Sequence, residues 1–152
     1  LAAEIHFKEI QQGLTFKHNG VKIESLLHQH PNGALGFRIS LGEKVIVYMT
    51  DTEHPEDGID EKVIRFAQKA DILIHDAHFT PGDLPAHRNW GHSSWEKAVD
   101  VAKRANVNSL YLFHFCPEYN DEKMEEIERE AKQHFPNLVA AREGLTIKIP
   151  TE

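Results

Sequence analysis

Three short apolar runs constrain the fold of this chain more than any other feature of its sequence. They lie at residues 44–49, 72–74 and 109–113 and are rich in β-branched and aromatic residues. Runs of this kind are typical of buried strands, and the stretches after them carry the apolar period of helices. Strands come first and strand–helix alternation follows, which is the pattern of a layered α/β domain. We therefore expect residues 1–152 to form one α/β unit.

The first part of the chain is predicted to consist of strands. Residues 5–10 alternate loosely between apolar and polar side chains and predict an edge strand. Asn19 and Gly20 lie between two strand-like runs, and Asn-Gly in this setting is a strong hairpin signal. Two further strands are predicted at residues 22–27 and 34–41.

Three helices are predicted over residues 59–70, 94–105 and about 121–135, each with an apolar stripe along one face. Ser93 is followed three residues later by Glu96, which is a capping-box pattern at the start of the second helix.

The end of the chain is predicted to carry one helix and two short strands. Asn120 or Asp121 can cap the last helix, which Pro136 ends. The strands are expected near residues 138–141 and 145–149.

Composition restricts the class of partner. The formal net charge is −7, and no cluster of Lys and Arg occurs. This balance argues against an extended nucleic-acid-binding face, although it leaves open a small phosphate ester held by a metal.

The cysteine count and the hydropathy indicate where the protein works. Cys116 is the one cysteine, so an internal disulfide is excluded and a reducing compartment such as the cytoplasm is expected. No apolar run approaches the roughly 20 residues needed to span a bilayer, and no signal peptide is visible.

Potential metal ligands follow the predicted strands. Asp51, Asp76 and His114 stand at or just after the ends of three of them, and His30 lies in the turn after a fourth. Ligands in open α/β folds bind beyond the carboxyl ends of strands, where loops converge on a rigid base. Imidazole and carboxylate suit zinc, manganese or iron, and a carboxylate can bridge two metals. We predict that His30, Asp51 and His114 are metal ligands, the alternative being hydrogen-bonded turn, cap or core residues.

The remaining histidines and one tryptophan receive more ordinary interpretations. His78 and His87 are expected in a surface loop, with lining of a substrate pocket as the alternative. Trp90 is expected to be a packing anchor rather than a base-stacking platform. Surface or turn positions are expected for His6, His18, His28, His54 and His134.

Five ordered segments carry a resemblance to a known family. They read HPNGALGFRI, VIVYMTDTE, ADILIHDAHFT, GHSS and LYLFHFCPEYND. In this order they resemble the C-terminal half of the metallo-β-lactamase superfamily. They are most similar to its phosphodiesterase-like branch, which includes the tRNA 3′-processing endonucleases and small cyclic-phosphate phosphodiesterases. The resemblance covers about residues 21–149 and implies the C-terminal half of an αββα sandwich.

The resemblance implies roles for five residues. Asp51 matches the aspartate that bridges two metals, and His30 and His114 match metal-binding histidines. His92 matches a histidine that contacts the scissile phosphate and assists proton transfer. Asp76 stands where that histidine has an acidic partner, which is usually Glu in the family.

The sequence departs from the family in one large respect. The signature His-x-His-x-Asp-His, which supplies four ligands in the N-terminal half of the sandwich, does not occur. The chain therefore looks like a second half whose first half is absent or lies on another chain. A half sandwich would leave a sheet face bare, so we expect association with that first half or a homo-oligomer.

The resemblance implies a dinuclear metal-dependent phosphodiesterase in the complete protein, with this fragment alone inactive. Two divalent ions, zinc first with manganese or iron as alternatives, would activate a water to attack a small phosphodiester substrate. Two rival functions remain open. One is hydrolysis of a lactone or thioester at the same metal pair, and the other is a non-catalytic assembly or regulatory module.

Overall fold

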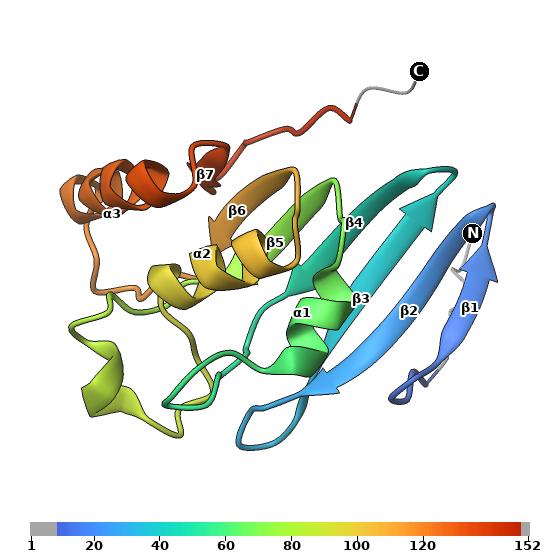
Figure 1. Cartoon of the computed structure of the whole chain (residues 1–152), viewed down its shortest axis with the longest axis horizontal. Coiled ribbons are helices and arrows are strands. Elements are labelled where there is room, and N and C mark those ends of the chain that lie inside the picture. The colour runs from blue at the N-terminus through green and yellow to red at the C-terminus, as the bar shows by residue number, and fades with distance from the viewer. Residues whose placement is uncertain (1–8, 150–152) are drawn as a thin grey trace, which may run out of the picture.

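The computed structural model describes residues 9–149, which contain a seven-stranded sheet (Figure 1). The strands lie in the sheet in the order in which they occur in the chain. They are β1 Thr15–His18, β2 Val21–His28, β3 Ala34–Leu41, β4 Lys44–Met49, β5 Ile72–Asp76, β6 Ser109–Phe113 and β7 Leu138–Ala140. The helices are α1 Glu61–Ala67, α2 Trp95–Arg104 and α3 Asp121–His134, and a short 3-10 helix spans Leu84–His87.

The sheet changes its pairing at β4. Strands β1 to β4 pair antiparallel, whereas β4 to β7 pair parallel. Parallel neighbours need a crossover, and α1, α2 and α3 supply the three crossovers in turn. As a result, the carboxyl ends of β4, β5 and β6 meet at one edge of the sheet.

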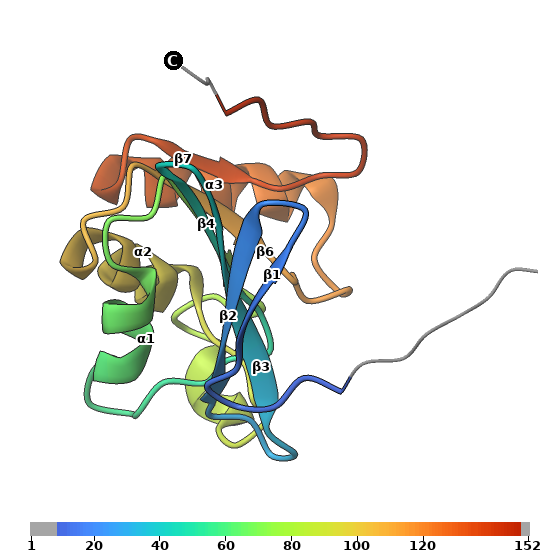
Figure 2. The same cartoon turned by 90° about the vertical axis from the view of Figure 1, so that its right-hand side faces the viewer.

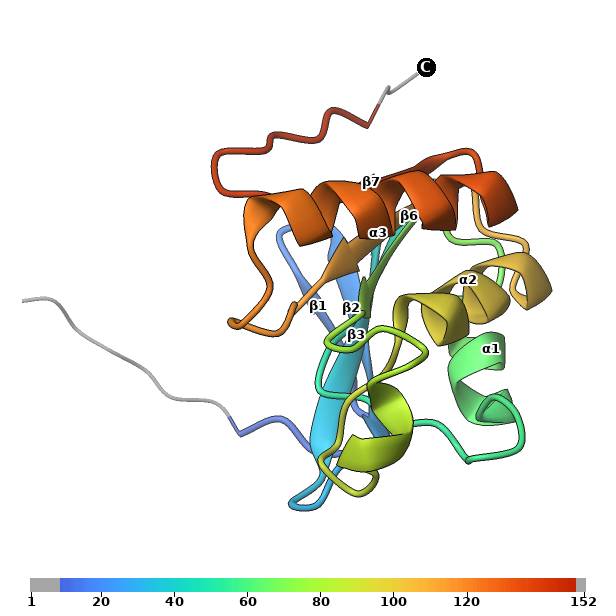
Figure 3. The ribbon, with the colours of Figure 1, turned by 90° about the vertical axis from the view of Figure 1, so that its left-hand side faces the viewer.

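The hydrophobic core lies between the sheet and its helices. Figure 2 and Figure 3 show α1 and α2 on one face of the sheet, with α3 along the β7 edge. The strands contribute Val47, Met49, Leu73, Leu110 and Leu112, each 0% exposed, and the helices contribute Val63, Ala98, Val101 and Ile127. This packing fixes the strand ends on which the polar residues stand.

The opposite face of the sheet is apolar and open. The side chain of Arg38 points toward α1, where it donates to the carbonyl of Phe66. Because successive side chains of a strand point to opposite faces, the neighbouring Phe37 points to the other face of the sheet. A row of half-exposed apolar side chains crosses that face in register: Phe37, Tyr48, Ile74 and Tyr111. Within residues 9–149 no helix packs over this row (Figure 2).

Most of the predicted elements are confirmed. The strands at residues 34–41 and 44–49 are β3 and β4 with the expected bounds. The hairpin turns at Asn19 and Gly20, whose φ angles of 48° and 82° are the left-handed values that this turn needs. The last helix is capped by Asn120, whose side chain accepts from the backbone N–H of Lys123 at 2.9 Å.

The predicted start of the second helix is wrong by one residue. Ser94, not Ser93, is the N-cap, and its side chain accepts from the backbone N–H of Lys97. The backbone N–H of Ser93 instead donates to the carboxylate of Asp76 at 3.0 Å. The site therefore takes the residue that the capping pattern had assigned to the helix.

The two ends of the chain also differ from the prediction. Residues 145–149 form no strand, and Leu145 and Ile147 are 42% and 36% exposed. An alternating pattern makes a strand only where a neighbour offers its backbone groups, and this segment lies away from the sheet (Figure 1). Of the edge strand predicted at residues 5–10, residues 5–8 lie outside the described part, and residues 9–10 are not in a strand. The first helix is shorter than predicted because Asp60 caps it and Lys69 turns into the left-handed region with a φ of 55°.

Candidate active site

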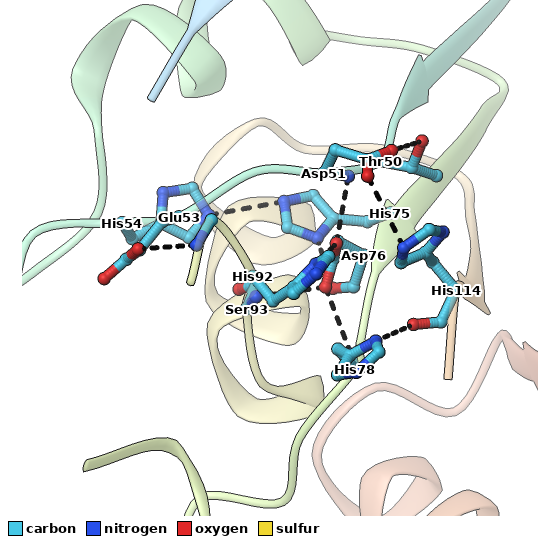
Figure 4. Close-up of polar contacts among 11 residues, drawn as sticks. Thr50, Asp51, Glu53, His54, His75, Asp76, His78, His92, Ser93 and His114 are labelled. Atoms are coloured by element: carbon cyan, nitrogen blue, oxygen red, sulfur yellow. Dashed lines mark hydrogen bonds and ion pairs between the residues drawn. The ribbon is translucent and has the colours of Figure 1, made fainter. Parts of the chain in front are cut away.

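Three polar residues meet where the parallel strands end. Asp51 lies just after β4, Asp76 is the last residue of β5, and His114 follows β6 (Figure 4). Nε2 of His114 lies 3.5 Å from Oδ1 of Asp51. Two of the three predicted metal ligands are thus neighbours across adjacent loops.

Asp51 and His114 share an uncommon backbone conformation. Their φ angles are 55° and 61°, in the left-handed region that few residues with a side chain adopt. Such strain persists only where the surroundings impose it, and it is concentrated at functional sites. Each residue leaves its strand in this conformation and aims its side chain at the other.

The carboxylate of Asp76 is a buried acceptor that connects several segments of the site. It is 0% exposed and accepts four hydrogen bonds. Oδ2 accepts from the backbone N–H of Asp51 at 2.9 Å and from Nδ1 of His92 at 3.0 Å. Oδ1 accepts from the backbone N–H groups of Ser93 and His78, at 3.0 and 3.1 Å. The aspartate therefore reaches its histidine, although the resemblance implies the longer Glu at this position.

His92 is oriented by this carboxylate. Because a carboxylate only accepts, Nδ1 of His92 carries the hydrogen, and Nε2 is left for another partner. The hydrogen bond to Asp76, opposed in part by burial, raises the pKa of His92 above its ordinary value of 6.5. A histidine of this kind keeps its proton closer to neutral pH.

His78 belongs to the site, contrary to the expectation of a surface loop. Its ring stacks on that of His92 with centroids 4.2 Å apart and planes 13° from parallel. Its Nδ1 donates to the backbone carbonyl of His114 at 2.9 Å. Burial, and then the neighbouring His92, lower the pKa of His78 below 6.5.

A three-histidine group results. Ligand nitrogens of His78, His92 and His114 all lie within 4.8 Å of one another, and this is the one such metal-compatible group among residues 9–149. The rings of His92 and His114 are 5.0 Å apart, and those of His78 and His114 are 5.6 Å apart.

His30, the third predicted metal ligand, stands at the rim and is not part of this group. Its ring centroid lies 6.2 Å from that of His92. Its Nδ1 accepts from the backbone N–H of Asn32 at 3.4 Å. The ring packs against Gly91, where an added Cβ would fall 2.1 Å from Cδ2 of His30. A glycine is therefore required beside His92 for His30 to occupy its place.

Glu53 is a site residue that the sequence analysis missed. Its carboxylate is buried and accepts from the backbone N–H groups of Asn89 and Gly91, each at 2.9 Å. Arg88 lies 3.4 Å from the same carboxylate. Glu53 thus anchors the loop that carries His92. The one feature of the sequence that could have pointed to Glu53 is its place as a second acidic residue, two positions after Asp51.

Two buried histidines, His54 and His75, are hydrogen-bonded in series beneath Asp76. The backbone N–H of Asp60 donates to Nδ1 of His54, and Nε2 of His54 contacts Nε2 of His75 at 3.3 Å. Nδ1 of His75 donates to the carbonyl of Asp76 at 2.8 Å. His75 therefore accepts through Nε2, and His54 donates to it. Burial lowers the pKa values of both histidines.

The surface positions predicted for two histidines are wrong. His28 is 6% exposed and His54 is 2% exposed. Burial lowers the pKa of His28 from 6.5 to about 4. His18 and His134 are exposed, as predicted, and His6 lies outside the described residues.

Trp90 is not the packing anchor that was expected. Its side chain is 60% exposed, and its ring contacts His87 edge-on at a centroid distance of 4.8 Å. His87 in turn stacks on Phe79 at 4.3 Å. An exposed aromatic ring therefore stands on the loop that leads to His92.

A cleft of about 710 Å³ adjoins His114 between the β6–β7 edge and α3. Its wall on α3 includes the acidic residues Asp121, Glu125 and Glu128. Arg142 also lines the cleft, and its guanidinium lies 3.5 Å from the carboxylate of Glu128.

Comparisons with known proteins identify the family to which this chain belongs. Residues 2–115 match a family described as the beta-lactamase superfamily domain. The chain belongs to the metallo-beta-lactamase superfamily. Other members of the superfamily have similar sequences: Ribonuclease Z of Synechocystis sp. is 39% identical over 107 residues, which cover 68% of this chain and 31% of that protein. Ribonuclease Z of Bacillus licheniformis is 42% identical over 81 residues, which cover 53% and 26%.

Solved structures of the superfamily share the fold. The metallo-beta-lactamase fold protein YhfI of Bacillus subtilis aligns with a TM-score of 0.76 at 24% identity, over 90% of this chain and 53% of that one. The short form of human tRNase Z aligns with a TM-score of 0.67 at 20% identity, over 90% and 46%. The chain spans less than a third of the length of the two ribonuclease Z relatives. Within residues 9–149, no helix combines the length and the hydrophobicity that a bilayer span requires.

Proposed function

We propose that the complete protein is a metal-dependent phosphodiesterase with a dinuclear site. The proposal rests on two pairs of residues that lie side by side where the parallel strands end. Asp51 and His114 lie 3.5 Å apart, and beside them His92 is hydrogen-bonded to the buried Asp76. One pair has the chemistry of metal ligands and the other that of a proton donor.

The donor set fits divalent metal ions. Thr50 donates to Oδ2 of Asp51 at 2.9 Å, which leaves Oδ1 facing His114. Carboxylate oxygen and imidazole nitrogen together suit zinc, with manganese or iron as further possibilities. Asp51, His114 and His30 are the residues of this chain that would hold the two ions, with Asp51 shared between them. The remaining ligands would come from the N-terminal half of the sandwich, so these 152 residues alone are expected to be inactive.

Bound metal ions would supply Lewis-acid polarisation of the phosphoryl oxygens and of the attacking water. His92 supplies the proton chemistry, because Asp76 fixes its Nδ1–H and raises its pKa. Its Nε2 would bind the phosphate or protonate the leaving oxygen. Glu53 holds the loop of His92 in place through Asn89 and Gly91.

A small phosphodiester suits this part of the molecule better than a long RNA. The net charge is −7, and the cleft beside His114 has an acidic wall. Both features weaken the binding of an extended polyanion. Two relatives bear the name Ribonuclease Z, which supports cleavage of a phosphodiester without fixing its size.

The open sheet face is proposed to be the contact with a second layer. The row of Phe37, Tyr48, Ile74 and Tyr111 is apolar and half-exposed, and such a face favours association. We propose that the N-terminal half of the sandwich, on the same or another chain, covers this face. Where that half is missing, we expect the chain to form a homo-oligomer through the same face. A stable monomer of this chain in sedimentation, without a bound partner, would remove this part of the proposal. The single cysteine, Cys116, supports a reducing compartment, for which we propose the cytoplasm.

The experiment is a substrate panel on the native assembly, with its metal content measured in parallel. An aryl phosphodiester, a lactone and a thioester are supplied as substrates. The proposal predicts metal-dependent turnover of the phosphodiester that a chelator abolishes and added zinc or manganese restores. Turnover of the lactone or thioester alone would identify an acyl hydrolase. A metal-free assembly that turns over none of them would identify a non-catalytic module.

A further inference from the structure

Three histidines from three separate segments converge at the mouth of the site. His78 follows β5, His92 precedes α2, and His114 follows β6 (Figure 4). All three are half-buried, and their ligand nitrogens lie within 4.8 Å of one another. Donor atoms this close together could hold one metal ion.

The hydrogen bonds leave a free nitrogen on two of these rings. Nδ1–H of His78 donates to the carbonyl of His114 at 2.9 Å, and Nδ1–H of His92 donates to Asp76 at 3.0 Å. In each neutral ring Nε2 therefore holds a free lone pair. Metal-binding histidines are typically held in this way, with the second nitrogen bonded to a carbonyl or a carboxylate.

We propose that His78, His92 and His114 bind one zinc ion without a ligand from any other segment. Three imidazoles with an open fourth position are a sufficient protein ligand set for zinc. This ion site differs from the proposed dinuclear site, because it uses His78 and His92 in place of Asp51 and His30 and shares His114 alone.

The two uses of His92 exclude each other. An ion at the three-histidine site occupies the lone pair of Nε2, which the phosphodiesterase role needs for a proton. In the complete protein, a zinc ion bound to the three histidines would therefore block the phosphodiesterase reaction. The ion site itself does not depend on the proposed reaction, since its evidence is the geometry of three rings.

The test is isothermal titration of the metal-free 152-residue chain with zinc. The wild-type chain is expected to bind one ion. His78→Gln, which lies outside the proposed dinuclear site, is expected to weaken binding by more than about 10-fold, as is His92→Gln. His18→Gln, which changes an exposed histidine of β1, is the control and should not alter the affinity. His30→Gln removes a proposed ligand of the dinuclear site and so distinguishes the two ion sites: if the three histidines bind the ion, this variant keeps the wild-type affinity.

A second measurement, on the wild-type chain, tests the inference even if one of the variants does not fold. NMR of the wild-type chain should show the ring signals of His78, His92 and His114 shifting on addition of zinc, with that of His18 unchanged. Absence of zinc binding to the wild-type chain would overturn the inference. So would binding that His30→Gln weakens and His78→Gln does not. That last result would place the ion with Asp51 and His30, and the proposed phosphodiesterase site would survive it.

Discussion

The carboxylate of Asp76, which is completely buried, accepts the Nδ1–H of His92 at 3.0 Å. The same carboxylate also receives three backbone N–H groups from the loops on either side of it. One side chain thereby fixes the orientation of the histidine and the course of the loops around it. Its replacement should have separable effects on protonation and on stability.

Asp76→Asn should lower the pKa of His92, because the amide removes the charge that holds the proton. In the wild-type protein, the interaction that raises this pKa stabilises the folded state. Its contribution is fully present below pH 6.5, the ordinary pKa of histidine, and is lost as the pH rises through the pKa of folded His92. The variant should also lose about 1–3 kcal/mol at every pH, since an amide cannot accept all four hydrogen bonds. NMR titration of the His92 ring measures the first effect, and urea unfolding measures the second. Asp100→Asn, on the exposed side of α2, is the control and should change neither quantity.

Gly91→Ala should displace His30. The φ of Gly91 is +87°, and the new Cβ would lie 2.1 Å from Cδ2 of His30 and 2.7 Å from its Nε2. Gly42→Ala is a matched control, because Gly42 also has a positive φ, +58°, with nothing within 4 Å of the added Cβ. Both variants should lose about 1–2 kcal/mol of stability from backbone strain. A shift of the His30 ring signals in the NMR spectrum is expected in Gly91→Ala alone, and an unshifted His30 would contradict the close packing.

Glu53→Gln should loosen the loop before His92. The amide can accept one of the two hydrogen bonds from Asn89 and Gly91, and it loses the ion pair with Arg88. The expected cost is about 1–3 kcal/mol. Hydrogen exchange at the amides of Asn89 and Gly91 should accelerate, whereas the exposed control Glu43→Gln should leave their exchange unchanged. Equal protection in both variants would show that Glu53 does not anchor the loop.

Acid should destabilise the protein through its buried histidines. The pKa of His28 is lowered from 6.5 to about 4, so between these values the unfolded chain binds a proton that the folded chain does not. Stability therefore falls as the pH drops through this window. The urea midpoint of the wild-type protein should decrease between about pH 7 and about pH 5, and that of His28→Gln should decrease less. His18→Gln should follow the wild-type protein, and an identical decrease in all three would contradict the role of His28.

The sequence predicted the parts of the fold that local patterns control. The runs at residues 34–41 and 44–49 became β3 and β4, and Asn19-Gly20 formed the hairpin turn. Each of these elements depends on alternation or turn chemistry within a few residues. The predicted strand at residues 145–149 failed because a strand also needs a neighbour with which to pair.

The site was harder to predict because distant residues assemble it. The strand-end rule placed Asp51, Asp76 and His114 together, and the structure has them at one edge. Nothing local shows that Glu53 would reach Gly91, 38 residues away, or that His78 would stack on His92. His28 and His54 were assigned to the surface by residue type, whereas their neutral rings are buried beneath the site.

The central claim is that His92 moves a proton or binds the phosphate beside the proposed dinuclear site, to which it contributes no ligand. The most direct measurement is the turnover of an aryl phosphodiester by the native assembly and by its His92→Gln variant, with metal content determined for both. Turnover is expected to fall roughly 10²- to 10⁴-fold in the variant while both proteins keep the two ions of the dinuclear site. Unchanged phosphodiester turnover in His92→Gln, at the same metal content, would contradict it.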